Sequence, residues 1–251
     1  MSLTRHEIES YYSELFIEDP LWSANFPNPD EAARWAKISI CLSHIAKARI
    51  RCSGERLRIL DVGCGRGWMT RLAGVYGDCE GIDNVPEVIE SAQRAFPGTN
   101  FFLGTVSALK RAPGFKPYDV LIASEVIEHV EDKEPFVEDL ADCLHPGGHA
   151  VITTPRGEVF QKWLRLNHKR QPVEAWISEK ELSLLFERHG FHPLSHDRVY
   201  LDLPAMSFLN RFCAARRISK SLNALGLTWL LKGLCYAAAI YQLWHFQLRK
   251  G

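Results

Sequence analysis

From residue 57 onward, short runs of apolar residues alternate with stretches in which apolar and polar residues recur at helical spacing. This order is typical of βαβ units around a parallel sheet. The expected strands are residues 57–62, 79–83, 100–103, 119–124, 150–154, 191–200 and 239–250. The expected helices follow Trp68 and Pro86 and span residues 133–144 and 178–189. Ser178 and Glu181 form a capping box, which marks the start of the last of these helices.

Two segments fall outside this alternating region. Residues 1–50 predict helices interrupted by a proline-containing loop at 20–29, so we expect a helical N-terminal extension or lid. The main domain then covers residues 51–251, with a leucine-rich insert at 204–236 before its last strand. No acidic residue follows Asp202, whereas seven Lys or Arg residues do, so this tail has a formal charge of +7. Because the whole chain is neutral, the remainder has a charge of −7.

Composition narrows the class of protein. With 46% hydrophobic and 24% charged residues among 251, the chain can build a core and is not disordered. Its seven cysteines are scattered without a C-x-x-C pair, which argues against a zinc ribbon or a secreted disulfide framework. The acidic N-terminus lacks the apolar core of a signal peptide, so a cytoplasmic protein is expected. Residues 222–244 approach the length of a membrane span, but Gly226, Lys232 and Gly233 argue against one. Peripheral contact with the inner membrane stays open.

The strongest chemical signal is the segment ILDVGCGRGW at residues 59–68, in which an apolar strand leads into glycines before a helix. Gly63, Gly65 and Gly67 let a ligand approach the backbone where a side chain would block it, and a helix N-terminus presents free N–H groups. Asp83 ends the next expected strand, where a carboxylate can accept both hydroxyls of a ribose. The combination predicts a cofactor that contains a nucleoside.

Four segments carry a family resemblance: LDVGCGRG, GIDNVPEVIESAQ, YDVLIASEVIEHV and LHPGGHAVITTP. In this order they resemble class I S-adenosylmethionine-dependent methyltransferases, and they are most similar to the O-methyltransferases of ubiquinone biosynthesis. The resemblance implies a Rossmann-like α/β fold whose seven-stranded sheet has the order 3-2-1-4-5-7-6, with strand 7 antiparallel. It also implies S-adenosylmethionine as the cofactor, because acidic residues after the second and fourth strands suit a cationic sulfonium.

The resemblance assigns implied roles to individual residues. Asp83 would bind the ribose, and the methionine part of the cofactor would lie against Asp61 and Gly63. Thr105 and Val106 stand where the family often has an acidic residue beside adenine. The full set of implied cofactor-binding residues is Asp61, Gly63, Gly65, Gly67, Asp83, Asn84, Val85, Thr105, Val106 and Ser124.

Glu125, Glu128 and His129 follow the fourth expected strand, at the sheet edge where ligands bind in open α/β folds. The motif is similar to a metal-linked E-x-x-E-H in the ubiquinone enzymes and in enzymes that methylate the terminal 2′-hydroxyl of small RNAs. One interpretation is therefore a divalent metal site formed by Glu125, Glu128, His129 and His168. The other is a metal-free pocket in which His129, beside Glu128, is the general base, because imidazoles titrate near neutral pH. Both stay open.

The predicted activity is methyl transfer to an oxygen of a small, lipid-linked or glycan-linked acceptor. The insert combines cations such as Arg211, Arg216 and Arg217 with Trp229 and several leucines, which suits an anionic membrane surface or a lipid-linked substrate. A helical cap on the sheet or a dimer contact would have the same composition. The neutral overall charge disfavours nucleic acid as a partner. Two rival functions stay open: an RNA 2′-O-methyltransferase with a metal-assisted site, and a non-catalytic S-adenosylmethionine-binding protein docked to a membrane or a partner.

Overall fold

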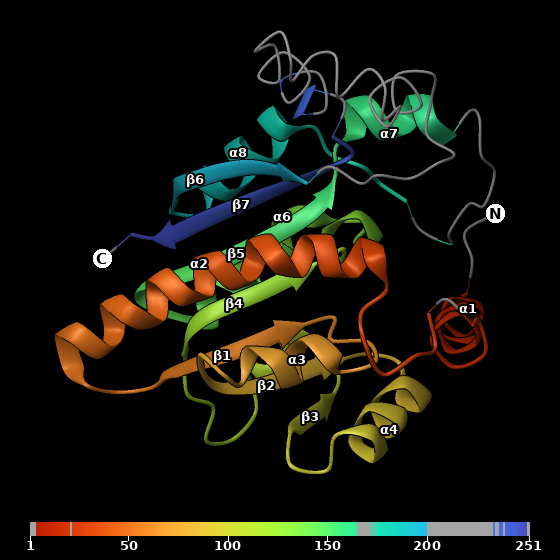
Figure 1. The fold of residues 1–251 in the computed structure, drawn as a ribbon, viewed down its shortest axis with the longest axis horizontal. Helices are drawn as coiled ribbons and strands as arrows, with labels where there is room; N and C mark the ends of the chain where they lie inside the picture. The colour runs from red at the N-terminus through yellow and green to blue at the C-terminus, as the bar shows by residue number, and fades with distance from the viewer. Residues whose placement is uncertain are drawn as a thin grey trace, which may run out of the picture.

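The computed structural model describes residues 4–20, 22–164, 172, 174–199, 233, 236–237 and 239–249. They form a seven-stranded sheet in the order β3-β2-β1-β4-β5-β7-β6 (Figure 1), which is the order that the resemblance implies. β7 runs antiparallel to β5 and β6, and the other neighbouring strands are parallel. The strands are β1 Leu57–Val62, β2 Gly77–Asp83, β3 Asn100–Leu103, β4 Tyr118–Ser124, β5 Leu144–Pro155, β6 Phe191–Val199 and β7 Tyr241–Leu248.

The helices begin where the local sequence favours a helix start. Pro86 occupies the first turn of α4, where its missing N–H removes no hydrogen bond. The Ser178 hydroxyl accepts from the Glu181 N–H at 3.3 Å, and the Glu181 carboxylate accepts from the Ser178 N–H at 2.9 Å, which confirms the capping box. The helices are α1 Arg5–Ile17, α2 Pro29–Ser53, α3 Trp68–Ala73, α4 Pro86–Ala95, α5 Val106–Leu109, η1 Ile127–His129, α6 Lys133–Asp142, α7 Gly157–Leu164 and α8 Glu179–Arg188.

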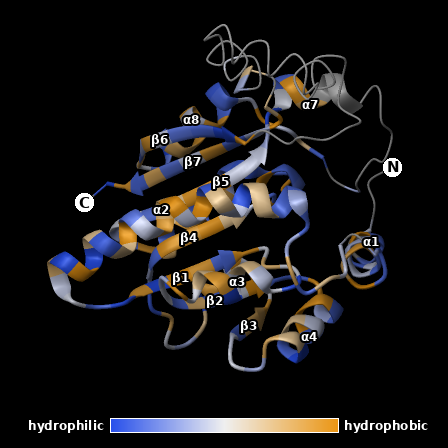
Figure 2. Cartoon of the chain, in the orientation of Figure 1, coloured by the Kyte–Doolittle hydropathy of each residue, from blue (hydrophilic) through white to orange (hydrophobic). Residues whose placement is uncertain are grey.

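The central strands bury side chains on both faces of the sheet. In β4, Val120 and Ile122 pack in the cluster that contains α2 and α3, whereas Leu121 and Ala123 pack in the cluster that contains α6 and α8. All four are at most 1% exposed, and burial of a Val, Leu or Ile side chain stabilises the fold by about 1.5–3 kcal/mol. Figure 2 shows β1 and β4 in the hydrophobic colour. Coverage of both faces explains why these strands are continuous apolar runs in the sequence.

β5 starts earlier than the pattern predicts, at Leu144 rather than residue 150. Leu144 pairs with Tyr118 at the start of β4, and the register then shifts before Val120 pairs with His149. The irregularity accommodates the segment that contains Pro146 and two glycines. The sequence pattern instead predicts a helix up to residue 144 and a strand only from residue 150.

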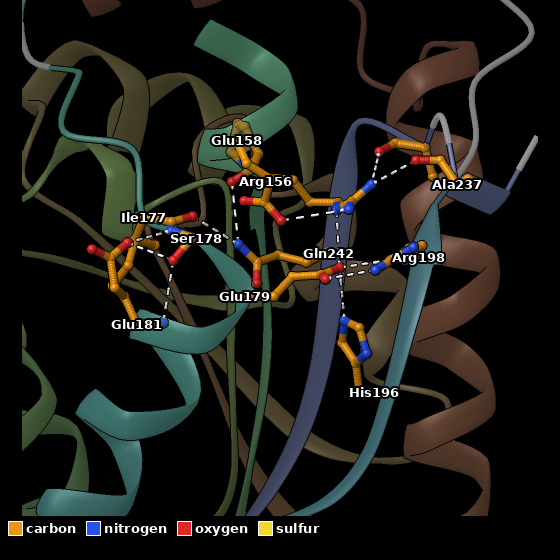
Figure 3. Close-up of polar contacts among 12 residues, drawn as sticks. Arg156, Glu158, Ile177, Ser178, Glu179, Glu181, His196, Arg198, Ala237 and Gln242 are labelled. Carbon is orange, nitrogen blue, oxygen red and sulfur yellow. Dashed lines mark hydrogen bonds and ion pairs between the residues drawn. The ribbon is translucent and has the colours of Figure 1, made fainter.

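A network of charged side chains around Glu179 joins the chain segments on either side of the insert (Figure 3). The Glu179 carboxylate accepts from the guanidinium of Arg198 at 2.7 Å, through both oxygens, and lies 2.9 Å from Nε of Arg156. Arg156 also donates to the carbonyl oxygens of Ala237 and Ala239 at 3.1 and 2.8 Å. The end of β5, the start of α8, β6 and the approach to β7 are therefore held together.

Most of the insert at 204–236 lies outside the described residues. Among the residues that are described, no helix combines the length and the apolar character needed to cross a bilayer.

The N-terminal region has two different parts. α2 packs on the sheet through Ile38, Leu42 and Ile45, so the boundary expected at residue 50 falls inside a helix that covers the core. α1 instead lies at the carboxyl ends of the strands and packs against α4 (Figure 1). Of these two parts, α1 therefore lies at the edge where the strands end, and α2 belongs to the layer that covers the sheet.

Candidate functional site

The turn after β1 requires glycine for two reasons. Gly63, Gly65 and Gly67 have φ values of +66°, +50° and +79°, a left-handed conformation that costs other residues about 1–2 kcal/mol each. In addition, an added Cβ would lie 2.5 Å from Val126 at position 63 and 2.5 Å from the Phe101 ring at position 67. The backbone of this loop is therefore packed closely on both sides, while position 65 faces the more open side toward α1.

Asp83, at the end of β2, fixes the glycine loop. Its carboxylate accepts from the N–H groups of Gly65 at 3.0 Å and Val85 at 3.1 Å. Burial raises the pKa of Asp83, and these backbone donors, together with that of Asn84, oppose the rise. An ionised carboxylate has about four acceptor sites, so these three backbone donors do not saturate it. Asp83 thus fits the expected ribose-binding carboxylate.

Asp61 is only 2% exposed and accepts a hydrogen bond from the Thr70 hydroxyl at 2.7 Å, which joins β1 to α3. Burial raises the pKa of Asp61 to about 7. A cation bound beside this carboxylate would stabilise its ionised form. Asp61 is therefore suited to contact a positively charged part of a ligand.

The residues after β3 lie beside Asp83 because Leu103 pairs with Asp83 in the parallel ladder and Gly104 donates to its carbonyl at 2.9 Å. The Thr105 hydroxyl accepts from the N–H of Ala108 at 3.2 Å and caps α5, and Val106 is 4% exposed. The structure therefore brings the implied adenine-side residues to the implied ribose carboxylate. It also shows that Thr105 has a structural role as a helix cap.

Glu125, the first acidic residue after β4, already contacts other side chains of the protein. Glu125 has a φ of +60°, an uncommon backbone conformation for a residue with a side chain. Its carboxylate accepts from the Thr153 hydroxyl at 3.1 Å and lies 3.9 Å from Nε of Arg34. Burial raises the pKa of Glu125, and the charge of Arg34 opposes the rise. Ser124, next to it, shares a hydrogen bond of 2.8 Å with Thr153.

Glu128 and His129 form a pair in η1. Glu128 is 3% exposed, and one of its oxygens accepts from the Thr154 hydroxyl at 2.9 Å. Its other oxygen lies 3.8 Å from Nε2 of His129. An imidazole next to a buried, fixed carboxylate can accept a proton and have the resulting charge stabilised.

The described residues do not fit the metal interpretation. Within them, no three His, Cys, Asp or Glu side chains are grouped so that they could hold a metal ion. Glu125 is turned to Arg34 and Thr153, so only Glu128 and His129 remain as neighbouring ligands. His168, the expected fourth ligand, lies outside the described residues.

A small cavity of about 100 Å³ connects the glycine loop with the end of β4. Its lining includes Phe16 and Trp22, from α1 and the segment after it, together with Asp61, Gly65 and Ser124. Residues for which the family resemblance implies cofactor binding and residues of the N-terminal extension therefore line the same cavity.

The segment between α1 and α2 is fastened to the glycine loop. Arg66, within the loop, pairs with the Glu31 carboxylate and donates to the carbonyl oxygen of Ala24. The Trp68 indole donates to the same Glu31 carboxylate at 3.2 Å. Glu31 and Arg66 are 5% and 3% exposed, so this is a buried ion pair. Sequence analysis missed it. In the structure, Asn28 and Glu31 also form the capping box at the start of α2.

Arg34 is a second residue that sequence analysis missed. It lines the cavity, its guanidinium pairs with Asp30 at 2.7 Å, and its Nε has no hydrogen-bond partner although it is buried. Nothing in the local sequence distinguishes Arg34 from a surface arginine of a helix.

Known proteins of one family resemble this chain over much of its length. A family model described as a methyltransferase domain matches residues 30–196. A ubiquinone biosynthesis O-methyltransferase of Rickettsia canadensis is 38% identical over 105 residues, which are 40% of this chain and 43% of the relative. A malonyl-[acyl-carrier protein] O-methyltransferase of Halalkalibacterium halodurans is 28% identical over 148 residues, 56% of this chain and 52% of the relative. The chain thus spans about half the length of these relatives or less.

Solved structures share the fold. The magnesium protoporphyrin IX methyltransferase of Synechocystis, with bound S-adenosylhomocysteine, has a TM-score of 0.65 at 11% identity and covers 98% of this chain and 100% of its own. An N-methyltransferase of Bradyrhizobium japonicum, also in complex with S-adenosylhomocysteine, has a TM-score of 0.62 at 14% identity, over 96% of this chain and 98% of its own. Since the family model matches well over half of the 251 residues and the strand order agrees, the chain belongs to the class I S-adenosylmethionine-dependent methyltransferases.

Proposed function

We propose that the chain transfers a methyl group from S-adenosylmethionine to an oxygen atom of a small, lipid-linked or glycan-linked acceptor. The observation that carries this proposal is the pair of Glu128 and His129 at the carboxyl end of β4, the same sheet edge as the glycine loop. Two relatives from different organisms, both named O-methyltransferases, support oxygen as the receiving atom.

In the proposed reaction, the cofactor supplies the activated methyl group and the protein positions the acceptor and takes its proton. When bound, S-adenosylmethionine supplies a methyl group on a sulfonium that is already activated for displacement. The protein has to hold the acceptor in line and exclude water. His129 would take the hydroxyl proton as the oxygen attacks the methyl carbon, a contribution of about 10²–10⁴-fold in rate. Glu128, fixed by Thr154, would orient the imidazole and stabilise its positive charge.

We assign the other residues to binding. Asp83 would hold the ribose, and the backbone of Gly63 and Gly65 would allow the methionine part to approach. Asp61 would face the positive charge of that part. No step of this proposal uses a metal, because Glu125 already contacts Arg34 and Thr153.

The basic insert supports a lipid-linked acceptor and a cytoplasmic location in contact with the inner membrane. Each cation near an anionic surface contributes about 1 kcal/mol. Replacing Arg211, Arg216 and Arg217 by glutamine should therefore weaken sedimentation with phosphatidylglycerol vesicles about 100-fold. Phosphatidylcholine vesicles are the control. If the unmodified protein does not sediment with anionic vesicles, the membrane part of the proposal is wrong.

The experiment that tests the activity is incubation with methyl-labelled S-adenosylmethionine and a lysate of the source, followed by separation of the organic extract from aqueous polymer. Label in the organic extract is expected. Label in ribonuclease-sensitive polymer would instead support RNA methylation. Binding of S-adenosylhomocysteine with no transfer to any fraction would favour a non-catalytic binding protein. His129→Ala should bind S-adenosylhomocysteine normally and lose at least 100-fold in transfer.

A further inference from the structure

One face of α1 contacts both the glycine loop and the proposed base, His129. Tyr12 and Phe16 are four residues apart and lie on the same side of the helix. Their rings are stacked, with centroids 6.2 Å apart at 18°. The Phe16 ring covers Gly65 and would be 3.7 Å from a Cβ at that position. The Tyr12 ring meets the imidazole of His129 edge-on, at 5.6 Å and 68°. α1 therefore touches the cofactor loop and the proposed base at the same time.

We propose that Tyr12 is a positioning residue of the transfer reaction, carried by α1 as a lid: its ring fixes the imidazole of His129 against the buried carboxylate of Glu128. This inference rests on the proposed function, since it assumes that His129 accepts the proton. The carboxylate restrains the imidazole from within the fold, at 3.8 Å, and the Tyr12 ring restrains it from the lid.

The phenol itself is not suited to act as a base. Burial, followed by the charge of Glu128 and then by Tyr11, Glu174 and Asp83, raises the pKa of Tyr12 far above its usual value. The hydroxyl therefore keeps its proton at neutral pH, and the ring contact is the part of Tyr12 that can act on His129.

The lid is attached at both ends of its segment. α1 packs against α4, the helix that follows Asp83, and the segment before α2 is fastened through the carbonyl oxygen of Ala24, which accepts from Arg66. Because Arg66 belongs to the glycine loop, the loop that would hold the cofactor also holds the chain that carries Tyr12. The ring contact is thus supported by the same backbone that forms the cofactor site.

The test compares Tyr12→Phe, Tyr12→Leu and Tyr12→Ala in label transfer from methyl-labelled S-adenosylmethionine into the source lysate. A misplaced catalytic group can cost up to about 10²-fold in rate. We therefore expect Tyr12→Leu and Tyr12→Ala to lose about 10- to 100-fold and Tyr12→Phe to keep most of the rate, because phenylalanine retains the ring. Ile17→Ala is the matched control, because Ile17 is an apolar residue of the same helix that is 40% exposed, and the transfer rate of this variant should change less than threefold. Binding of S-adenosylhomocysteine should change less than threefold in Tyr12→Phe.

A double-substitution cycle separates positioning from a general loss of structure. If Tyr12 acts through His129, Tyr12→Ala should cost less than threefold once His129 is already alanine. An equal loss in both backgrounds would overturn the proposal, as would full activity of Tyr12→Ala or a loss in Tyr12→Phe as large as in Tyr12→Leu. Absence of transfer by the unmodified protein would instead mean that the proposed function has failed.

Discussion

Gly67→Ala tests whether the glycine loop is as tightly constrained as its geometry indicates. The left-handed φ of +79° would cost alanine about 1–2 kcal/mol. The new methyl group would also lie 2.5 Å from Cζ and 2.7 Å from Cε1 of the Phe101 ring, and 3.0 Å from Cβ of Ala92. Overpacking of this kind costs about 1–3 kcal/mol. The free energy of unfolding should therefore fall by about 2–5 kcal/mol.

Gly65→Ala is the matched control, because it shares the positive φ, +50°, but its Cβ would have only an ordinary contact with Phe16 at 3.7 Å. It should cost about 1–2 kcal/mol. Urea unfolding followed by circular dichroism measures both changes. Phe101→Leu provides a second comparison, since removing the ring should reduce the cost of Gly67→Ala. Equal costs at positions 65 and 67, or no relief from Phe101→Leu, would refute the steric part of the reasoning.

Three further predictions concern the network around Glu179, the metal and the histidines of the sheet. Glu179→Ala should lower stability by about 3 kcal/mol, because the buried charge of Arg156 loses its nearer carboxylate, at 2.9 Å, and keeps that of Glu158 at 3.4 Å. A loss below 1 kcal/mol in urea unfolding would contradict this prediction. Extensive dialysis against EDTA should leave label transfer unchanged, and recovery of a lost activity by Mg²⁺ or Zn²⁺ would restore the metal interpretation. Burial, with the charges of His149 and His44, lowers the pKa of His245 from 6.5 to about 4. Between these two pKa values the unfolded chain binds a proton that the folded protein does not. The free energy of unfolding is therefore highest above about pH 6.5 and falls by up to about 3 kcal/mol as the pH decreases to 4. His245→Gln should therefore flatten the pH dependence of the urea midpoint in this range, and an unchanged dependence would contradict the assignment.

Much of the fold could be predicted because the strands are short apolar runs and the glycine loop has few conformational solutions. β1 and β3 have the predicted bounds, and the positive φ values of Gly63, Gly65 and Gly67 explain why glycine occurs at these positions. The strand order followed from the family resemblance and not from periodicity. The early start of β5 was missed because its pairing with Tyr118 depends on a register shift that has no local signal.

The candidate site was predicted less completely, for a physical reason. Asp83 and the glycine loop are adjacent in the fold because β1 and β2 are neighbouring strands, and the family resemblance implies this order. Tyr12, Glu31 and Arg34 come from helices that precede the sheet, and their contacts depend on how those helices pack. The ion pair between Glu31 and Arg66 spans 35 positions and could not be deduced from either residue alone.

The measurement that tests the central claim most directly is calorimetric titration of S-adenosylhomocysteine into the unmodified protein, Asp83→Asn and Asp78→Ala. Asparagine keeps an acceptor for the Gly65 N–H but removes the charge that would bind the ribose hydroxyls. Hydrogen bonds to a charged group contribute about 1.5–3 kcal/mol each, so loss of two should weaken binding by at least 100-fold. Asp78, an exposed residue of β2 that pairs with Arg56, should be replaceable without effect. Tight binding by the unmodified protein and loss in Asp83→Asn alone are expected, whereas no binding, or equal affinity in all three proteins, would contradict the account.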